Sequence, residues 1–371
     1  MHNELARLTP PPVSGENELE QAAFQQKFNP TITNHPNLPV IDWTLIGQSA
    51  PVLVNTPTQL PAAEAVIITW AEAEWAALEH VFCSGSTAMS YADRNKSSWS
   101  GWQQCTEDLP STQPGEGWDY WGEYRLVQIG GKNVLLFKSN THLDFPGESY
   151  LAQMIELLIT KANPSLIMSI GTAGGAIPTD HIGTINTVNA GTLYAANEPE
   201  SKWSEYSNNW QAAWGAVSKP DFSKLLFPVP TIQNDIASLV KQFNSYYQTS
   251  YTAEQLNNNN LNMGTTPPSV NNMTTAGTPL LTTSTFVVAT TDGNLKDFAC
   301  VEMDDAIIAM TCKNKGVAFG FVRNVSDPAQ NSALPPKIQG SWGSAIYEAY
   351  GIYTSYNGAL TAAAILYEQL A

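Results

Sequence analysis

Residues 299–329 read ACVEMDDAIIAMTCKNKGVAFGFVRNVSDPA. Three carboxylates surround one methionine at residues 302–305, and an apolar run with helical spacing follows them. The Lys-Gly pair at 315–316 is typical of a helix end, and residues 317–322 have the composition of a short buried strand. This strand leads directly into RNVSD at 323–327. Because ligands of open α/β sheets bind beyond the carboxyl ends of strands, the stretch predicts a small-molecule site with more than one carboxylate.

Three earlier segments have the pattern of strands from the same sheet. Residues 65–78 read AVIITWAEAEWAAL, which predicts a buried strand, an acidic turn and a helix. Residues 165–175 read SLIMSIGTAGG, a buried strand that ends in a glycine-rich turn, and HIGTINTVNAGTLY at 181–194 continues as the next strand. Strands that alternate with helices predict a three-layer α/β/α sandwich around a mixed central sheet.

Taken together, these segments resemble the nucleoside phosphorylase superfamily, of the purine nucleoside phosphorylase and uridine phosphorylase type. The likeness is strongest to the nucleosidase branch, which cleaves 5'-methylthioadenosine and S-adenosylhomocysteine. Members have Val-Glu-Met-Glu at the start of a helix and, further along, a strand that ends in Arg-x-x-Ser-Asp. Here VEMD begins at residue 301 and RNVSD at residue 323. The resemblance covers about half of the chain and implies cleavage of the N-glycosidic bond of a purine nucleoside or 5'-modified adenosine.

Such a cleavage needs a proton for the departing base and an activated water, and two carboxyl groups supply both when burial separates their pKa values. The resemblance places the general acid at Asp327, which the hydroxyl of Ser326 can orient, and the water-activating carboxylate at Glu74. The residues alone leave other interpretations open. Asp327 before Pro328 is also a common turn signal. Glu72 and Glu74 are also ordinary acids of a helix start, where the helix dipole favours them.

The resemblance further implies a set of residues that bind the substrate. Asp304 stands where the family has a glutamate that binds the ribose 2' and 3' hydroxyls. It is one methylene shorter, so the sugar lies deeper, a water bridges the gap, or Asp305 substitutes for it. Phe286 would stack on the purine, although a strand phenylalanine is more often core. The alternative for residues 172–174 is a plain tight turn, and the alternative for residues 302–304 is an acid-rich helix start. The implied set is Thr172, Ala173, Gly174, Phe286, Val287, Glu302, Met303, Asp304 and Ser326.

The composition excludes several classes of function. The 371 residues carry 17 basic and 33 acidic side chains, a formal net charge of −16. Nucleic-acid binding requires clustered Lys and Arg, so a neutral nucleoside fits this charge better than a polyanion. The five histidines show no metal-ligand spacing, and neither GK[ST] nor GxGxxG is present, so no cofactor is expected. The sequence contains no run of 18 apolar residues, so no membrane partner is expected, and no secretory signal is found. We therefore expect the cytoplasm, with a mature secreted form as the alternative.

The arginines bear on the choice between water and phosphate as the nucleophile. Phosphorylases bind phosphate with Arg, and the chain has only Arg7, Arg94, Arg125 and Arg323. None lies in the turn after the first strand or in KSNTH at 138–142, which favours hydrolysis. Arg94, Lys138 and His142 stay open as phosphate ligands, in which case inorganic phosphate is a co-substrate. A binding or storage protein without turnover is a second alternative, which the low charge and the shortened Asp304 favour.

The chain divides into an extended arm at 1–62 and one α/β domain at 63–371, with polar insertions at about 84–120 and 196–279. The arm is expected to lie over the domain or over a neighbouring subunit, which makes a homo-oligomer plausible. The second insertion is predicted to contain a helix at 232–247, whereas its polar, Asn-rich stretches are expected to stay outside the core. A disulfide between Cys83 and Cys105 is an alternative to free thiols. The last helix is predicted with a break near Gly351.

Overall fold

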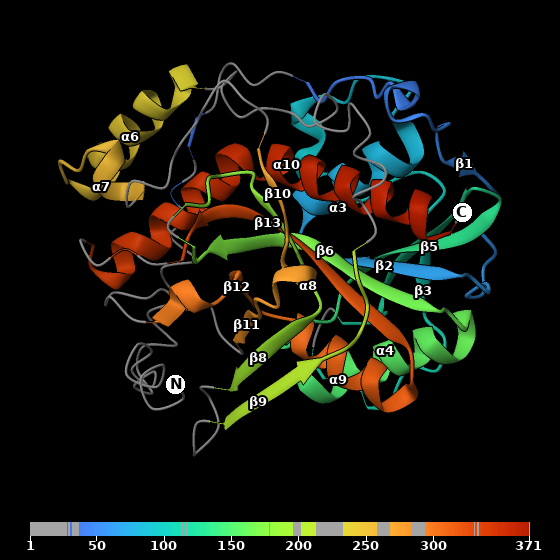
Figure 1. Ribbon diagram of the computed structural model, residues 1–371. Coiled ribbons are helices and arrows are strands. Elements are labelled where there is room, and N and C mark those ends of the chain that lie inside the picture. The colour runs from blue at the N-terminus through green and yellow to red at the C-terminus, as the bar shows by residue number, and fades with distance from the viewer. Residues whose placement is uncertain are drawn as a thin grey trace.

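The computed structural model describes residues 28, 30–31, 37–112, 114–115, 118–177, 179–195, 202–212, 233–257, 268–283, 294–329, 331 and 334–370. A mixed sheet lies at the centre, with helices on both of its faces (Figure 1). The helices α3 (Glu72–Glu79) and α10 (Pro336–Gln369) cover one face. The helices α4 (Glu148–Ala162) and α9 (Asp305–Lys315) cover the other. The predicted three-layer α/β/α sandwich is therefore confirmed.

Alternation along the strands explains the two layers of core. Successive side chains of a strand point to opposite faces of the sheet. Ile67 and Met168 accordingly pack with α3 and α10, whereas Ile68 and Ile167 pack with α4 and α9. Because both faces are covered, the central strands are apolar throughout, and β2 (Ala65–Thr69) is buried along its whole length.

The sheet has thirteen strands among the described residues. Its main path runs β1-β4-β5-β2-β6-β12-β11-β8-β9, and β13 pairs with β6 and with β7. Parallel pairs join β5, β2, β6 and β13, whereas β12 joins β6 antiparallel. The remaining strands are β1 (Val52–Leu53), β3 (Gln103–Cys105), β4 (Gly122–Ile129), β5 (Lys132–Ser139), β6 (Leu166–Gly175), β7 (Ile185–Val188), β8 (Ala190–Ala195), β9 (Lys202–Ser207), β10 (Val270–Asn272), β11 (Leu280–Thr283), β12 (Cys300–Glu302) and β13 (Ala318–Pro328).

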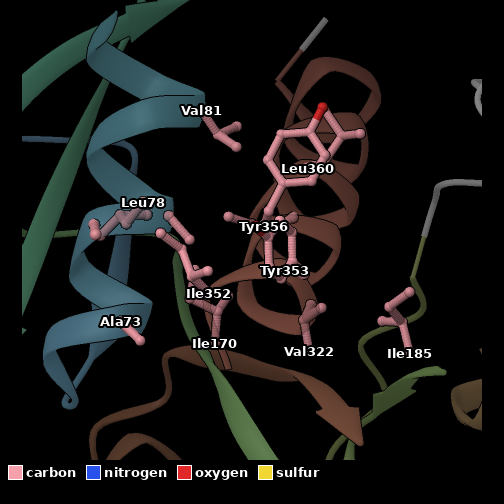
Figure 2. Packing of buried hydrophobic residues seen from close by; sticks show 14 of the residues in the cluster. Ala73, Leu78, Val81, Ile170, Ile185, Val322, Ile352, Tyr353, Tyr356 and Leu360 are labelled. Carbon is pink, nitrogen blue, oxygen red and sulfur yellow. The ribbon is translucent and has the colours of Figure 1, made fainter. Parts of the chain in front are cut away.

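Helix α10 is continuous, so the predicted break near Gly351 is wrong. The ring of Tyr347 lies where a side chain at this glycine would be: a built Cβ would come 2.9 Å from Cε2. Tertiary packing therefore overrides the low helix propensity of glycine. Figure 2 shows α10 packed against α3, with Tyr353 and Tyr356 near Leu78 and Val81.

The described part of the arm packs along the domain. β1 pairs antiparallel with β4, and Trp43 in η1 (Trp43–Ile46) packs against Tyr367 of α10 with ring centroids 5.5 Å apart. The other short helices are η2 (His80–Ser84), which continues α3, η3 (Tyr91–Asn95), α7 (Ala253–Asn257), α8 (Met273–Ala276) and η5 (Asn294–Asp297). None of the helices in the described part of the chain is long and apolar enough to cross a membrane.

The helix predicted in the second insertion is confirmed, and it contributes to the core. Helix α6 (Gln233–Tyr247) buries Leu239 and Phe243, and Phe243 meets the ring of Trp342 edge-on at 5.1 Å. The apolar residues recur at helical spacing, so one face packs inward although the segment is polar on average. Cys83 and Cys105 are free thiols, and the alternative of a disulfide is therefore wrong.

Candidate active site

Strand β6 changes partners near its carboxyl end, where most of the predicted site residues lie. β2 pairs with β6 as far as Ser169, whereas β12 pairs with it at Gly174 and Gly175. β13 follows the other side of β6 through this whole region. Between the two partners, the N–H of Thr172 donates to the side chain of Glu74 instead of to a strand. Carboxyl ends of parallel strands at such a change of neighbours are where α/β proteins bind ligands.

Glu74 joins the start of α3 to this end of β6. Its Oε1 accepts hydrogen bonds from the N–H and the hydroxyl of Thr172, both at 2.8 Å. Its Oε2 accepts from the hydroxyl of Thr69 at 2.9 Å and from the N–H groups of Trp70 and Ala71 at 3.1 and 3.0 Å. Five donors fill the roughly four lone-pair sites of a carboxylate, which is only 5% exposed. The predicted base role of Glu74 stays a prediction, and it would require the loss of one of these bonds.

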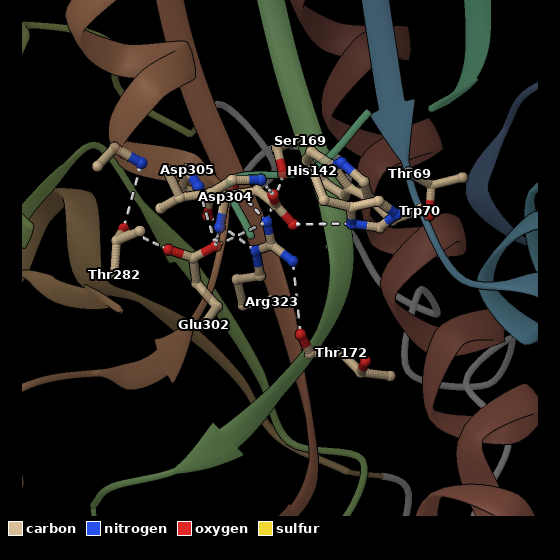
Figure 3. A network of polar contacts seen from close by, with 12 residues as sticks. Thr69, Trp70, His142, Ser169, Thr172, Thr282, Glu302, Asp304, Asp305 and Arg323 are labelled. Carbon is tan, nitrogen blue, oxygen red and sulfur yellow. Dashed lines mark hydrogen bonds and ion pairs between the residues drawn. The ribbon is translucent and has the colours of Figure 1, made fainter. Parts of the chain in front are cut away.

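Arg323 is the buried cation of the site (Figure 3). Its Nε donates to Asp305 at 2.8 Å, and its Nη2 donates to the other oxygen of the same carboxylate. Nη2 also lies 3.2 Å from Glu302 Oε2 and donates to the hydroxyl of Ser169 at 2.6 Å. The guanidinium faces the ring of Trp70, 5.3 Å from its centroid. One cation thus lies between two carboxyl groups that are both buried.

Glu302 caps the helix that carries the other acids. Its Oε2 accepts from the N–H groups of Asp304 and Asp305 at 2.7 and 2.9 Å, and its Oε1 accepts from the hydroxyl of Thr282. These bonds satisfy backbone donors at the start of α9. Burial, and to a lesser extent the charge of Asp305, raise the pKa of Glu302 to about 8, against the opposing effect of Arg323. Burial raises the pKa of Asp305 as well, so the two carboxyl groups titrate together beside Arg323.

We expect Glu302→Gln to make stability less dependent on pH. Folding raises the pKa of Glu302 from 4.5 to about 8, so the folded protein binds a proton that the unfolded chain releases above pH 4.5. The stability from this group is present below pH 4.5 and is lost as pH rises toward 8, by up to about 1.4 kcal/mol per pH unit. Urea unfolding at pH 5 and pH 8 measures the fall, which should be smaller in the variant. Parallel losses in both proteins would contradict this assignment.

Asp304 reaches away from its own helix to the loop at residues 141–147. It is the N-cap residue of α9, but its side chain makes no capping bond. Its Oδ1 accepts from the N–H of Leu143 at 2.8 Å, and its Oδ2 lies 3.6 Å from His142 Nδ1. Burial lowers the pKa of His142, but the hydrogen bond and charge of Asp304, together with Asp144, outweigh it and raise the pKa above its ordinary value.

Asp327 ends β13 opposite the glycine-rich end of β6. It pairs in register with Gly174, after an irregularity that leaves Ser326 without a partner in the register. The hydroxyl of Ser326 donates to Asp327 Oδ1 at 2.6 Å. Burial raises the pKa of Asp327 to about 6, although the bond from Ser326 works in the opposite direction. The structure thus makes Asp327, which is 8% exposed, a carboxyl group that can hold a proton close to neutral pH.

A glycine of α10 leaves room for this carboxyl group. A Cβ at Gly343 would lie 2.9 Å from Asp327 Oδ2. We expect Gly343→Ala to push the carboxyl group aside and to lower kcat about tenfold, which is about 1.4 kcal/mol of barrier. The same change at Gly351 meets Tyr347 instead and is the control, because both variants raise helix propensity equally. Steady-state kinetics and chemical unfolding measure both effects, and equal kcat values for the two variants would contradict the prediction.

The remaining predicted residues divide into three groups. Ala173 is buried and its carbonyl accepts from Ser326, whereas Gly174 packs so closely on Ala329 that a built Cβ would come 2.9 Å from Ala329 Cβ. Met303 is half-buried between the acids. Phe286 and Val287 lie outside the described residues. The structure thus brings the residues of β6, β12, β13 and the start of α9 together around one end of the sheet.

No protein-family model and no curated protein sequence matches the chain. Among solved structures, it is similar to the 5'-methylthioadenosine/S-adenosylhomocysteine nucleosidase of Neisseria meningitidis, with 14% identity over 82% of this chain and 99% of that one, and a TM-score of 0.42. The S-adenosylhomocysteine nucleosidase of Streptococcus pyogenes matches at 15% identity over 82% and 97%, with a TM-score of 0.42. Futalosine hydrolase of Helicobacter pylori matches at 11% over 80% and 97%, with a TM-score of 0.39. At these values, the likeness adds nothing to the chemistry of the site, which rests on the contacts above.

Sequence reasoning missed several residues of the contact network. Gly171 lies between two charged groups, because a built Cβ would come 2.7 Å from Arg323 Nη1 and 3.0 Å from Glu74 Oε1. Trp70 donates its ring N–H to the carbonyl of Thr141 at 3.2 Å, and its backbone N–H donates to Glu74. One signal for Arg323 is visible in the sequence: an arginine directly after a buried apolar strand must find a buried carboxylate partner.

Proposed function

We propose that the chain is an enzyme that hydrolyses the N-glycosidic bond of a purine nucleoside or a 5'-modified adenosine. The observation that carries this proposal is the state of Asp327. A carboxyl group whose pKa burial raises to about 6 can donate a proton near neutral pH. The bond from Ser326 fixes its orientation. Protonation of the leaving purine is the step in nucleoside cleavage that needs such an acid.

Asp304, at the start of α9, would supply the other half of the reaction. Cleavage gives the sugar the character of an oxocarbenium ion, which neighbouring carboxylates stabilise. Asp304 accepts one hydrogen bond from the loop at 141–147 and faces the ring of His142, and it retains acceptor capacity for the sugar hydroxyls. Asp305 does not substitute for it in this proposal, because both of its oxygens already accept from Arg323.

The partners of the arginines favour water over phosphate as the nucleophile. Arg94 pairs with Glu348 at 2.9 Å and lies over the ring of Tyr91. Arg125 donates to the carbonyl of Ser100 and lies 4.0 Å from Glu79. Arg323 is held by Asp305, so each of the three arginines in the described part of the chain already has a partner. Binding of inorganic phosphate would have to displace one of them.

Product analysis tests the proposal. Purified protein is incubated with 5'-methylthioadenosine, adenosine or inosine, with and without inorganic phosphate, and the free base and sugar are separated by chromatography. We expect release of the base at the same rate without phosphate, together with the free sugar. Sugar 1-phosphate formed only with phosphate would identify a phosphorylase. Tight nucleoside binding without release of any base would instead identify a binding protein.

A further inference from the structure

Trp70 places His142 beside the carboxylates of the candidate site. Its backbone N–H donates to Glu74, and its ring faces Arg323. The ring N–H of the same residue donates to the carbonyl of Thr141, directly before His142, and the two rings lie 6.4 Å apart (Figure 3). Asp304 also contacts His142 directly, with its Oδ2 3.6 Å from Nδ1. His142 therefore belongs to the same group of side chains as Glu74, although the proposed function gives it no role.

The loop holds His142 in a fixed position. Its N–H donates to the carbonyl of Phe145 at 2.9 Å, and its carbonyl accepts from the N–H of Gly147 at 3.1 Å. The hydroxyl of the preceding Thr141 donates to the carbonyl of Trp121 at 3.2 Å. Asp304 then fixes the ring, because its Oδ2 faces Nδ1. A carboxylate at one ring nitrogen sets the tautomer and leaves the other nitrogen as an acceptor.

The ring is also accessible. The side chain of His142 is 39% exposed, in contrast to the 5% exposure of Glu74. Among the residues that the structure describes, no hydrogen-bond partner is found for its Nε2. The charged groups around the ring are Asp304, Asp144 and Lys138. The two aspartates hold the pKa of His142 above its ordinary value, against burial and the charge of Lys138, which both lower it. An imidazole of this kind can take up a proton close to neutral pH.

We propose that His142, oriented by Asp304, is the general base that activates water, and that Glu74 is a positioning residue that ties α3 to β6. This inference rests on the proposed hydrolysis. His142 Nε2 removes a proton from water, whose oxygen bonds to the anomeric carbon. The C–N bond breaks, its electron pair goes to the purine, and Asp327 gives the purine its proton. Asp304 pairs with the imidazolium, and the proton on His142 returns to Asp327 through solvent.

The geometry also suggests why an aspartate is suitable at position 304. The longer side chain of glutamate would place its carboxylate one methylene further from the helix, whereas Asp304 is within reach of both Leu143 and His142. The shorter acid therefore binds the loop and orients the base at once. This proposal therefore explains both the aspartate at position 304, where the family motif has glutamate, and the position of His142.

Removal of the imidazole tests the assignment. For the nucleoside that the wild-type protein cleaves best among 5'-methylthioadenosine, adenosine and inosine, we expect His142→Ala to lower kcat about 100-fold with little change in KM. Added imidazole should restore part of the rate in this variant, because the side chain borders solvent. It should not restore the rate of Asp327→Asn. His181→Ala is the matched control and should keep the wild-type rate with or without imidazole.

The pH profile separates a base from a merely structural residue. The wild-type rate should follow two ionisations, one from Asp327 and one from His142. In His142→Ala only one should remain, a fall as pH rises through the pKa of Asp327 at about 6. In Asp304→Asn, nitrogen NMR of labelled histidine should show a lower pKa for His142. A wild-type rate in His142→Ala would overturn this inference alone. So would a loss of rate that imidazole does not restore and that leaves both ionisations in the pH profile. A wild-type protein that releases no base would overturn the proposed function with it.

Discussion

Asp327→Asn is expected to lower kcat for base release about 1,000-fold, in the upper part of the range for loss of a general acid. Asparagine has nearly the same shape, and its carbonyl oxygen can still accept the bond from Ser326. It has no acidic proton to give to the purine. The fold should therefore persist while protonation of the leaving group fails. Steady-state kinetics at pH 6 and pH 8 measure the loss, which should be largest at the lower pH because the wild-type acid is protonated there.

Asp180→Asn is the matched control for this variant. Asp180 is also buried, burial also raises its pKa, and it accepts hydrogen bonds from Asn186 and Asn271. It lies outside the contacts of Asp327, so we expect it to keep the wild-type kcat. An Asp327→Asn variant with wild-type kcat would remove Asp327 from the mechanism. A similar loss in both variants would point to general destabilisation instead of lost acid catalysis.

Arg323→Met should produce the largest loss of stability. The substitution leaves Asp305 and Glu302 as two buried carboxyl groups without their cation. Removal of one partner from a buried ion pair costs about 3–5 kcal/mol, because the remaining charge is desolvated and unpaired. Ser169 also loses the donor that its hydroxyl accepts from. The free energy of unfolding in urea at pH 7 measures this loss.

The pH dependence and a control identify the cause. At pH 5 the loss should be smaller, because protonated carboxyl groups need no cation. Lys315→Gln is the control at the other end of α9. Its partner Glu156 lies at 3.0 Å, but both side chains are more than 40% exposed, so the loss should stay below about 1 kcal/mol. Equal losses for the two variants, or a loss for Arg323→Met that is independent of pH, would contradict a buried ion-pair cluster.

Local patterns in the sequence determined most of the framework. The apolar runs predicted β2, β6 and β13, and Gly316 at the end of α9 has the left-handed conformation that its Lys-Gly context predicted, with φ of 72°. The order of the acids after two strands also predicted that Glu302, Asp304 and Asp327 come from neighbouring elements at one end of the sheet. These features depend on short-range periodicity and capping, which neighbouring residues encode by themselves.

Only the tertiary structure decided which buried groups meet. Thr172, which lies 98 positions from Glu74 in the sequence, donates to its carboxylate. Asp304 accepts from the N–H of Leu143, 161 positions away. The break predicted at Gly351 failed for a related reason, since packing against neighbours outweighs local propensity inside a buried helix. A local pattern shows that a polar side chain is buried, but the partner that compensates its desolvation comes from whichever strand or loop the fold brings beside it.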